Sequence, residues 1–256
     1  MNKNFMKMFA GAAAFSLTLL AGTAQAGEVS AAVAANFTGT MKEIAASFEQ
    51  ATGNTVKLSF GSTGKLYAQI KNGAPFDLFF AADARRPKLL EKSGTGVAGT
   101  RFTYAQGRLV LWSAKPGLVD DKGAVLKQGG FARIAIANPK TAPYGAAAKQ
   151  VMEKMGVWKQ LEPKVVRGEN IAQTFQFTVT ANAPLGFIAL SQLKSLGAKN
   201  HGSQWSIPAN LYTPIEQQAI LLKRGEDNAT ARAFLKYMKG PEAAKIIAKF
   251  GYGAGH

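Results

Sequence analysis

The sequence predicts an α/β protein of two doubly wound units, each a mixed sheet with helices on both faces. Apolar strand-like runs alternate with segments whose apolar residues recur every three or four positions, which is the pattern of βαβ units. The chain has 256 residues, of which 47 % are hydrophobic and 18 % charged. This length suits two domains, each with its own core. A weakly patterned stretch after Lys115 indicates a change of surroundings between the units.

Residues 1–26 are predicted to be a secretory signal peptide that is cleaved after Ala26. Lys3 and Lys7 precede an apolar run over 8–22, and Ala24-Gln25-Ala26 has the small-x-small pattern of a cleavage site. A membrane anchor is the alternative, but the run of about 15 residues is shorter than the roughly 20 that span a bilayer. We therefore expect a periplasmic protein, in which the absence of Cys is unremarkable.

The first unit is expected to run strand–helix–strand–helix–strand–helix. Gly53-Asn54 has the chemistry of a helix end, and the continuous apolar run over 76–81 suits a strand buried on both faces. Strands are expected over 28–34, 56–60 and 76–81, and helices around Met41–Phe48, Leu66–Ile70 and Arg86–Lys92.

The second unit is expected to occupy 108–213, between the two parts of the first unit, 27–107 and 214–256. The C-terminal helices should return to the first unit, because about 80 residues lack the helices to cover both faces of a sheet. The strands over 108–113 and 216–223 are then the expected crossing segments. The other expected elements are strands over 134–137 and 185–190, and helices through Val151–Met155 and over 191–196, 230–239 and 242–250.

Charge and composition point to an anionic partner and away from several kinds of catalysis. The 31 Lys and Arg outnumber the 15 Asp and Glu, and removing the leader leaves a net charge of +14. Export makes nucleic acid an unexpected partner. Without Cys and with only two His, the chain lacks thiolate metal sites and has little for a His-based metal site or a Ser-His-Asp triad. We expect neither an enzyme, nor a metal centre, nor a cofactor.

Two glycine-rich motifs need separate interpretations. Gly94–Gly99 matches G-x-G-x-x-G, but a helix precedes it instead of a strand, so we predict a loop. Gly61-Ser62-Thr63-Gly64-Lys65 lacks the spacing of a nucleotide-binding phosphate loop. It still lies between a strand and a helix, where backbone N–H groups and the helix dipole favour an anion. The alternative is a plain turn whose hydroxyls cap the helix.

Three other helix starts resemble this turn. Ala34–Thr38 follows a strand, Tyr144-Gly145 comes behind Pro143, and Asn170-Ile171 opens a helix after a polar loop. They carry small, hydroxyl or amide residues in place of basic ones. Helix starts lie at the carboxyl ends of the strands, where doubly wound sheets bind ligands. Two units can bring such ends together across a cleft.

Several segments together resemble the periplasmic molybdate-binding proteins of ABC importers. The resemblance covers the whole mature chain in order, although each segment alone is weakly specific. It implies a two-lobed periplasmic binding protein fold (type II) whose cleft closes on molybdate or tungstate, held by neutral donors. The segments are Ala34–Thr38, Phe60–Gly64, Asn72–Asp83, Pro143–Gly145, Ala183–Gly186 and Lys239–Glu242.

In the first lobe, the resemblance implies four ligand-binding positions. The first loop supplies Asn36, with Ala35 contributing backbone. The second loop supplies Thr63, with Ser62 beside it. The family usually has Ser at the position of Thr63, and Thr keeps the hydroxyl.

In the second lobe, the resemblance implies Tyr144 and Ile171. Tyr144 matches a position that is Tyr in some members and Ala in others, and Ile171 matches a backbone donor often occupied by Val. Many members have a Tyr at the position of Ala189. We expect Tyr144 to supply the phenol that Ala189 lacks.

The expected function is therefore capture of molybdate or tungstate, as a monomer, and delivery to the membrane permease of an ABC importer. A sulfate, phosphate or organic-anion binder of the same fold is the alternative. An enzyme, or a basic adaptor for acidic surface polymers, is a more distant one.

Overall fold

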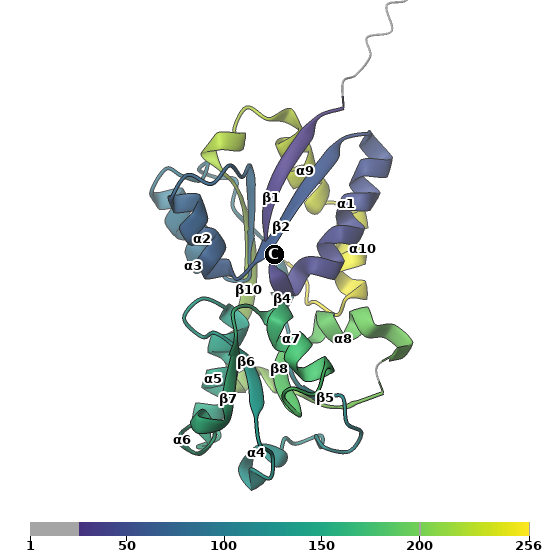
Figure 1. The fold of residues 1–256 in the computed structure, drawn as a ribbon. Helices are drawn as coiled ribbons and strands as arrows, with labels where there is room; N and C mark the ends of the chain where they lie inside the picture. The colour runs from purple at the N-terminus through teal and green to yellow at the C-terminus, as the bar shows by residue number, and fades with distance from the viewer. Residues whose placement is uncertain (1–25, 200, 256) are drawn as a thin grey trace, which may run out of the picture.

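The computed structural model describes residues 26–199 and 201–255, which form two lobes stacked one above the other (Figure 1). The predicted signal peptide lies outside the described residues except for Ala26. Each lobe contains a five-stranded mixed sheet covered by helices, so the predicted α/β class and the two units are confirmed. Within the described part of the chain, no helix has both the length and the apolarity that crossing a bilayer requires.

The sheet of the first lobe has the strand order β2-β1-β3-β10-β4. Strand β1 pairs in parallel with β2 and β3, whereas β10 pairs antiparallel with β3 and β4. The strands are β1 (Glu28–Ala34), β2 (Thr55–Gly61), β3 (Leu78–Ala81), β4 (Phe102–Gly107) and β10 (Ile215–Leu221).

Helices cover both faces of this sheet because the strand side chains alternate between two cores. Val29, Ala31 and Val33 of β1 face one core, with Phe37, Phe48 and Phe234, and Ala32 faces the other, with Leu66 and Leu90. The helices on the first face are α1 (Thr38–Thr52), α9 (Ala229–Met238) and α10 (Pro241–Lys249), and those on the second are α2 (Thr63–Lys71) and α3 (Arg85–Lys92).

The sheet of the second lobe has the order β7-β6-β8-β5-β9, with β6 parallel to β7 and β8. Its strands are β5 (Leu109–Ser113), β6 (Ile134–Ala137), β7 (Val165–Gly168), β8 (Leu185–Ala189) and β9 (Ser203–Ser206). Its helices are α4 (Val125–Gln128), α5 (Pro143–Lys154), α6 (Trp158–Leu161), α7 (Ile171–Val179) and α8 (Leu190–Leu196). Short 3₁₀ turns lie at Ala35–Phe37, Glu162–Lys164, Gly197–Lys199, Ala209–Leu211 and Lys223–Gly225.

The predicted crossing segments were wrong in detail. Strand β5 lies wholly in the second sheet and β10 wholly in the first, so the chain crosses at Arg108 and again over 207–214. The unpredicted strand β4 forms an edge of the first sheet beside β10. A strand satisfies its backbone groups within one sheet, which leaves the crossings to the loops.

Candidate functional site

A small cavity lies between the lobes, where strand ends and helix starts of both lobes meet. All six sequence-predicted positions line it: Ala35, Asn36, Ser62, Thr63, Tyr144 and Ile171. The atom-free space is about 200 Å³, and no lining residue carries a charged side chain. The remaining lining residues are Ala34, Gly61, Ala82, Ala142, Pro143 and Asn170.

Two hydroxyl groups of the first lobe are fixed by accepting backbone hydrogen bonds. The Oγ1 of Thr63 accepts from the Ala82 N–H at 3.0 Å, and the Oγ of Ser62 accepts from the Lys65 N–H at 3.4 Å. Both residues are buried. Because each oxygen is an acceptor in these bonds, each hydroxyl keeps its own proton for donation into the cavity. Ser62 therefore caps the helix, as the alternative interpretation of this turn expected, and this role is compatible with the predicted role as a donor.

Three helices begin at the cavity. Thr63 is the first residue of α2, Tyr144 follows Pro143 at the start of α5, and Ile171 is the first residue of α7. First-turn N–H groups have no intrahelical acceptor, and the helix dipole makes this end positive. The Oδ1 of Asn170 accepts from the N–H groups of Ala172 and Gln173, leaving the Ile171 N–H at the cavity wall. Such an arrangement attracts an anion.

Tyr144 brings a buried phenol to the cavity. Burial raises the pKa of Tyr144 well above its ordinary value, and the nearby Tyr252 and Tyr104 add to the shift, so the phenol keeps its proton. The nearby Asn36 amide counteracts part of this pKa shift, but the buried oxygen makes no hydrogen bond of normal geometry among the described residues. A Cβ at Gly107 would lie 2.3 Å from this oxygen, so the glycine at the end of β4 makes room for the ring. Ala189, at the end of β8, is fully buried and contributes no phenol.

Asn36 differs from its expected role as a side-chain donor. Its Nδ2 donates to the Oε1 of Gln217 at 2.7 Å and to the Oη of Tyr252 at 3.1 Å. Both amide protons are therefore engaged within the protein. The main-chain carbonyl oxygen of Asn36 accepts from the Oγ of Ser191 at 2.9 Å and from the Oη of Tyr252 at 2.8 Å. The main-chain N–H groups of this loop are the donors that remain.

This polar network under the cavity was not predicted from the sequence. Gln217, Tyr252 and Ser191 come from β10, the C-terminal tail and α8, and only their folding together makes them partners. Burial raises the pKa of Tyr252 far above its ordinary value. Gln217 is fully buried in β10 but stands between the polar Glu216 and Gln218, so no local pattern sets it apart.

The charged groups near the cavity are satisfied at its margin. Lys65 and Glu169 form an exposed ion pair of 2.7 Å between the lobes. The Oδ1 of Asp83, which follows the cavity residue Ala82, accepts from the Arg86 N–H at 2.8 Å. The Asp77–Arg224 pair of 2.6 Å lies at the other end of β3, away from the cavity. Within the described residues, no group of three or more His, Asp or Glu is arranged to hold a metal ion.

The chain is similar to proteins of known name over nearly its whole length. Residues 29–253 match the family of bacterial extracellular solute-binding proteins. The molybdate-binding protein ModA of Azotobacter vinelandii is 57% identical over 92% of this chain and 93% of its own length, and that of Rhodobacter capsulatus is 55% identical over 95% of each. The solved periplasmic molybdate-binding protein of A. vinelandii superimposes with a TM-score of 0.85 at 45% identity, covering 88% of this chain and 98% of that one. A sulfate-binding protein of Mycobacterium tuberculosis, 14% identical with a TM-score of 0.75, shares the fold, with 89% of this chain and 87% of its own covered.

Proposed function

We propose that this chain, which belongs to the family of bacterial extracellular solute-binding proteins, captures molybdate or tungstate between its lobes and delivers it to the permease of an ABC importer. The observation that carries the proposal is the neutral, donor-rich cavity. Its contributors come from both lobes, so a bound anion would hold the lobes together. The names of the similar proteins supply the choice of anion.

The proposed donors are two hydroxyls, one phenol and the first amides of several helices. They are the side chains of Ser62, Thr63 and Tyr144, with main-chain N–H groups of Ala35 or Asn36 and of Ile171. Such groups bind a tetrahedral dianion without a counter-charge. Omitting a Lys or Arg avoids the cost of burying a cation in the empty cleft.

The magnitudes permit tight binding by this route. About six hydrogen bonds to an anion contribute about 1.5–3 kcal/mol each, or about 9–18 kcal/mol together. Association and ordering cost at least about 4 kcal/mol. The remainder reaches submicromolar affinity, which corresponds to about −8 kcal/mol or better. The excess of surface cations then accelerates the arrival of a dianion.

We further propose the organisation that this function requires. The lobes are 27–107 with 214–256, and 108–213, and the ligand lies between them. The protein is exported to the periplasm with its leader cleaved after Ala26, and it acts as a monomer. It carries out no catalysis, binds no nucleic acid and needs no cofactor. The strand content of the two sheets and the extracellular character of the family support this organisation.

Titration calorimetry tests the proposal with molybdate, tungstate, sulfate and phosphate, each added to protein first stripped of bound anions. We expect submicromolar binding of molybdate or tungstate and much weaker binding of the smaller anions. Native mass spectrometry of the protein as purified identifies an anion that it already carries. Preferential binding of sulfate or phosphate would replace the proposed ligand, and binding of none of the four would reject the proposed function.

A further inference from the structure

We propose that Gly64 is a positioning residue for anion binding, because it allows a direct contact that closes the lobes. The closure contact consists of Gly64 and Arg86 from the first lobe with Lys140 and Thr141 from the second. The effect on affinity rests on the proposed function, whereas the effect on lobe closure does not.

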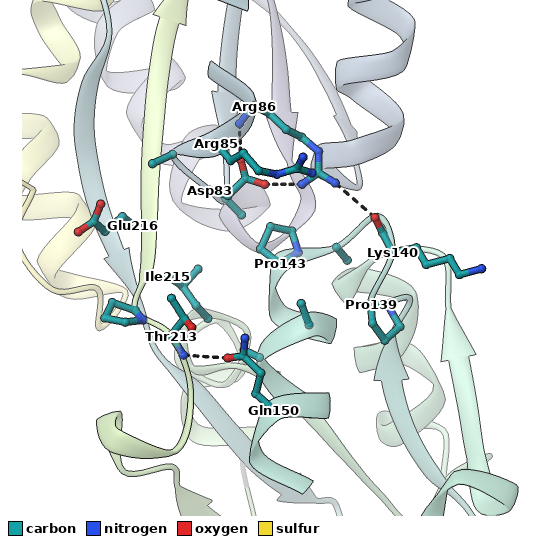
Figure 2. A pocket seen from close by; sticks show the side chains of 16 residues that line it. Asp83, Arg85, Arg86, Pro139, Lys140, Pro143, Gln150, Thr213, Ile215 and Glu216 are labelled. Atoms are coloured by element: carbon teal, nitrogen blue, oxygen red, sulfur yellow. Dashed lines mark hydrogen bonds and ion pairs between the residues drawn. The ribbon is translucent and has the colours of Figure 1, made fainter. Parts of the chain in front are cut away.

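Two hydrogen bonds join the lobes at this place. The backbone N–H of Gly64 donates to the carbonyl oxygen of Thr141 at 2.8 Å. The Nη2 of Arg86 donates to the carbonyl oxygen of Lys140 at 3.3 Å, drawn as a dashed line in Figure 2. The first lobe therefore holds two successive carbonyls of the loop that leads into α5.

Arg86 is fixed before it reaches across. Its Nη1 pairs with the Oδ2 of Asp83, a residue of the same lobe. Figure 2 shows the guanidinium group between Asp83 and Lys140. An arginine held by a carboxylate of its own lobe is pre-organised, so little side-chain entropy is lost when it bonds to the second lobe.

Gly64 is needed for the closeness of the contact. Its φ is not in the left-handed region, so its backbone conformation does not call for glycine. A Cβ at this position would lie 2.9 Å from the Cα of Thr141, 3.0 Å from its carbonyl oxygen and 2.9 Å from the Nη2 of Arg86. Two of these atoms are backbone of the other lobe. A side chain here would push the lobes apart.

The contact adjoins the proposed binding site without contributing a donor to it. Thr63, which precedes Gly64, and Ala142, which follows Thr141, both line the cavity. A larger pocket, lined by Arg86 and Lys140 among others, shares Ala82, Ala142 and Pro143 with the cavity. Weakening the contact would thus separate the donors of the two lobes and leave each donor intact.

The test compares Gly64→Ala with Gly130→Ala. A Cβ at Gly130 would meet nothing within 4 Å, and Gly130 does not have a positive φ, so it is a matched control. If closure becomes about tenfold less favourable, the apparent Kd for molybdate rises about tenfold. For Gly64→Ala we expect the dissociation rate to rise about tenfold and the association rate to change little. For Gly64→Val the dissociation rate should rise further. Gly130→Ala should bind as the parent does.

Interlobe distance provides a readout that a general loss of stability would not move. The chain has no Cys, so spin labels can be placed on Lys92→Cys and Lys159→Cys, exposed positions in different lobes. With molybdate, Gly64→Ala should keep a longer distance than the parent, while its circular dichroism is unchanged. Arg86→Lys, which loses the planar fork, should shift the distance in the same direction. Thr141→Val keeps the carbonyl and removes a hydroxyl that is buried without a partner among the described residues, so it should close normally.

Equal distances and equal dissociation rates for Gly64→Ala and the parent would overturn the proposal. If the parent binds neither molybdate nor tungstate, the proposed function fails separately. The closure contact is then judged on the distance distributions without ligand, where identical distributions for parent and Gly64→Ala would reject it.

Discussion

Replacing Tyr144 by Phe should affect binding and stability in opposite directions. The substitution keeps the ring, which packs in the core of the second lobe, and removes only the hydroxyl. That oxygen is buried and has no partner among the described residues. A group in this state costs about 1–3 kcal/mol of stability when the cavity is empty. The ligand-free Tyr144→Phe variant should therefore be as stable as the parent or more stable.

Binding should weaken in the same variant. If the phenol donates to an oxygen of a buried dianion, its loss costs about 1.5–3 kcal/mol, or about 10- to 150-fold in Kd. Adding Ala189→Tyr should recover part of the affinity if both hydroxyls reach the same oxygen, although overpacking at this fully buried position limits the gain.

Calorimetry with molybdate and sulfate measures the change in affinity, and thermal unfolding without ligand measures the change in stability. Tyr67→Phe is a suitable control, because Tyr67 lies on α2, packs against the core between α2, α3 and the first sheet, and does not line the cavity. An unchanged affinity for molybdate would mean that Tyr144 only lines the cavity. A clear loss of stability without ligand would mean that its hydroxyl has a partner within the protein.

Three further outcomes are expected. Lys65→Gln should change the free energy of molybdate binding by less than about 1 kcal/mol, because the side chains of Lys65 and Glu169 are more than half exposed and a surface ion pair contributes little. A loss of molybdate affinity above a hundredfold in calorimetry would instead indicate that Lys65 is a cationic ligand. Molybdate at a hundredfold excess over Kd should stabilise the protein by about 2.7 kcal/mol and reduce the radius of gyration in small-angle scattering, and no change in either quantity would contradict binding between the lobes. Folding raises the pKa values of the buried Tyr104, Tyr144 and Tyr252. Their contribution to the free energy of unfolding should therefore be constant below the unfolded pKa of about 10 and decline above it. Denaturant unfolding from pH 7 to 11 measures this free energy, and a value that rises above pH 10 would refute the prediction.

Local patterns in the sequence were sufficient for most of the first lobe and for the helix starts of the site. Strand β1 and helix α1 begin and end close to the predicted positions, because the apolar spacing and the Gly53 end are local signals. The turn at Ser62 and the cap at Asn170 follow from residue type and from their place between elements.

Short strands without a strong pattern were missed. Strands β7 and β9 have four residues each and mix polar with apolar side chains, and β4 is an edge strand. Pairing with neighbours distant in the sequence decides such segments, so tertiary context overrides their weak local preference.

Which groups of the site are free to act depends on contacts between distant parts of the chain. Local patterns place the polar side chains of Asn36 and Tyr144 at helix starts. The fold engages both amide protons of Asn36, through Gln217 and Tyr252, and leaves the Tyr144 hydroxyl without a partner among the described residues. The partners of Asn36 lie 181 and 216 residues away along the chain. A hydrogen bond depends on distance and direction in space, which local spacing does not encode.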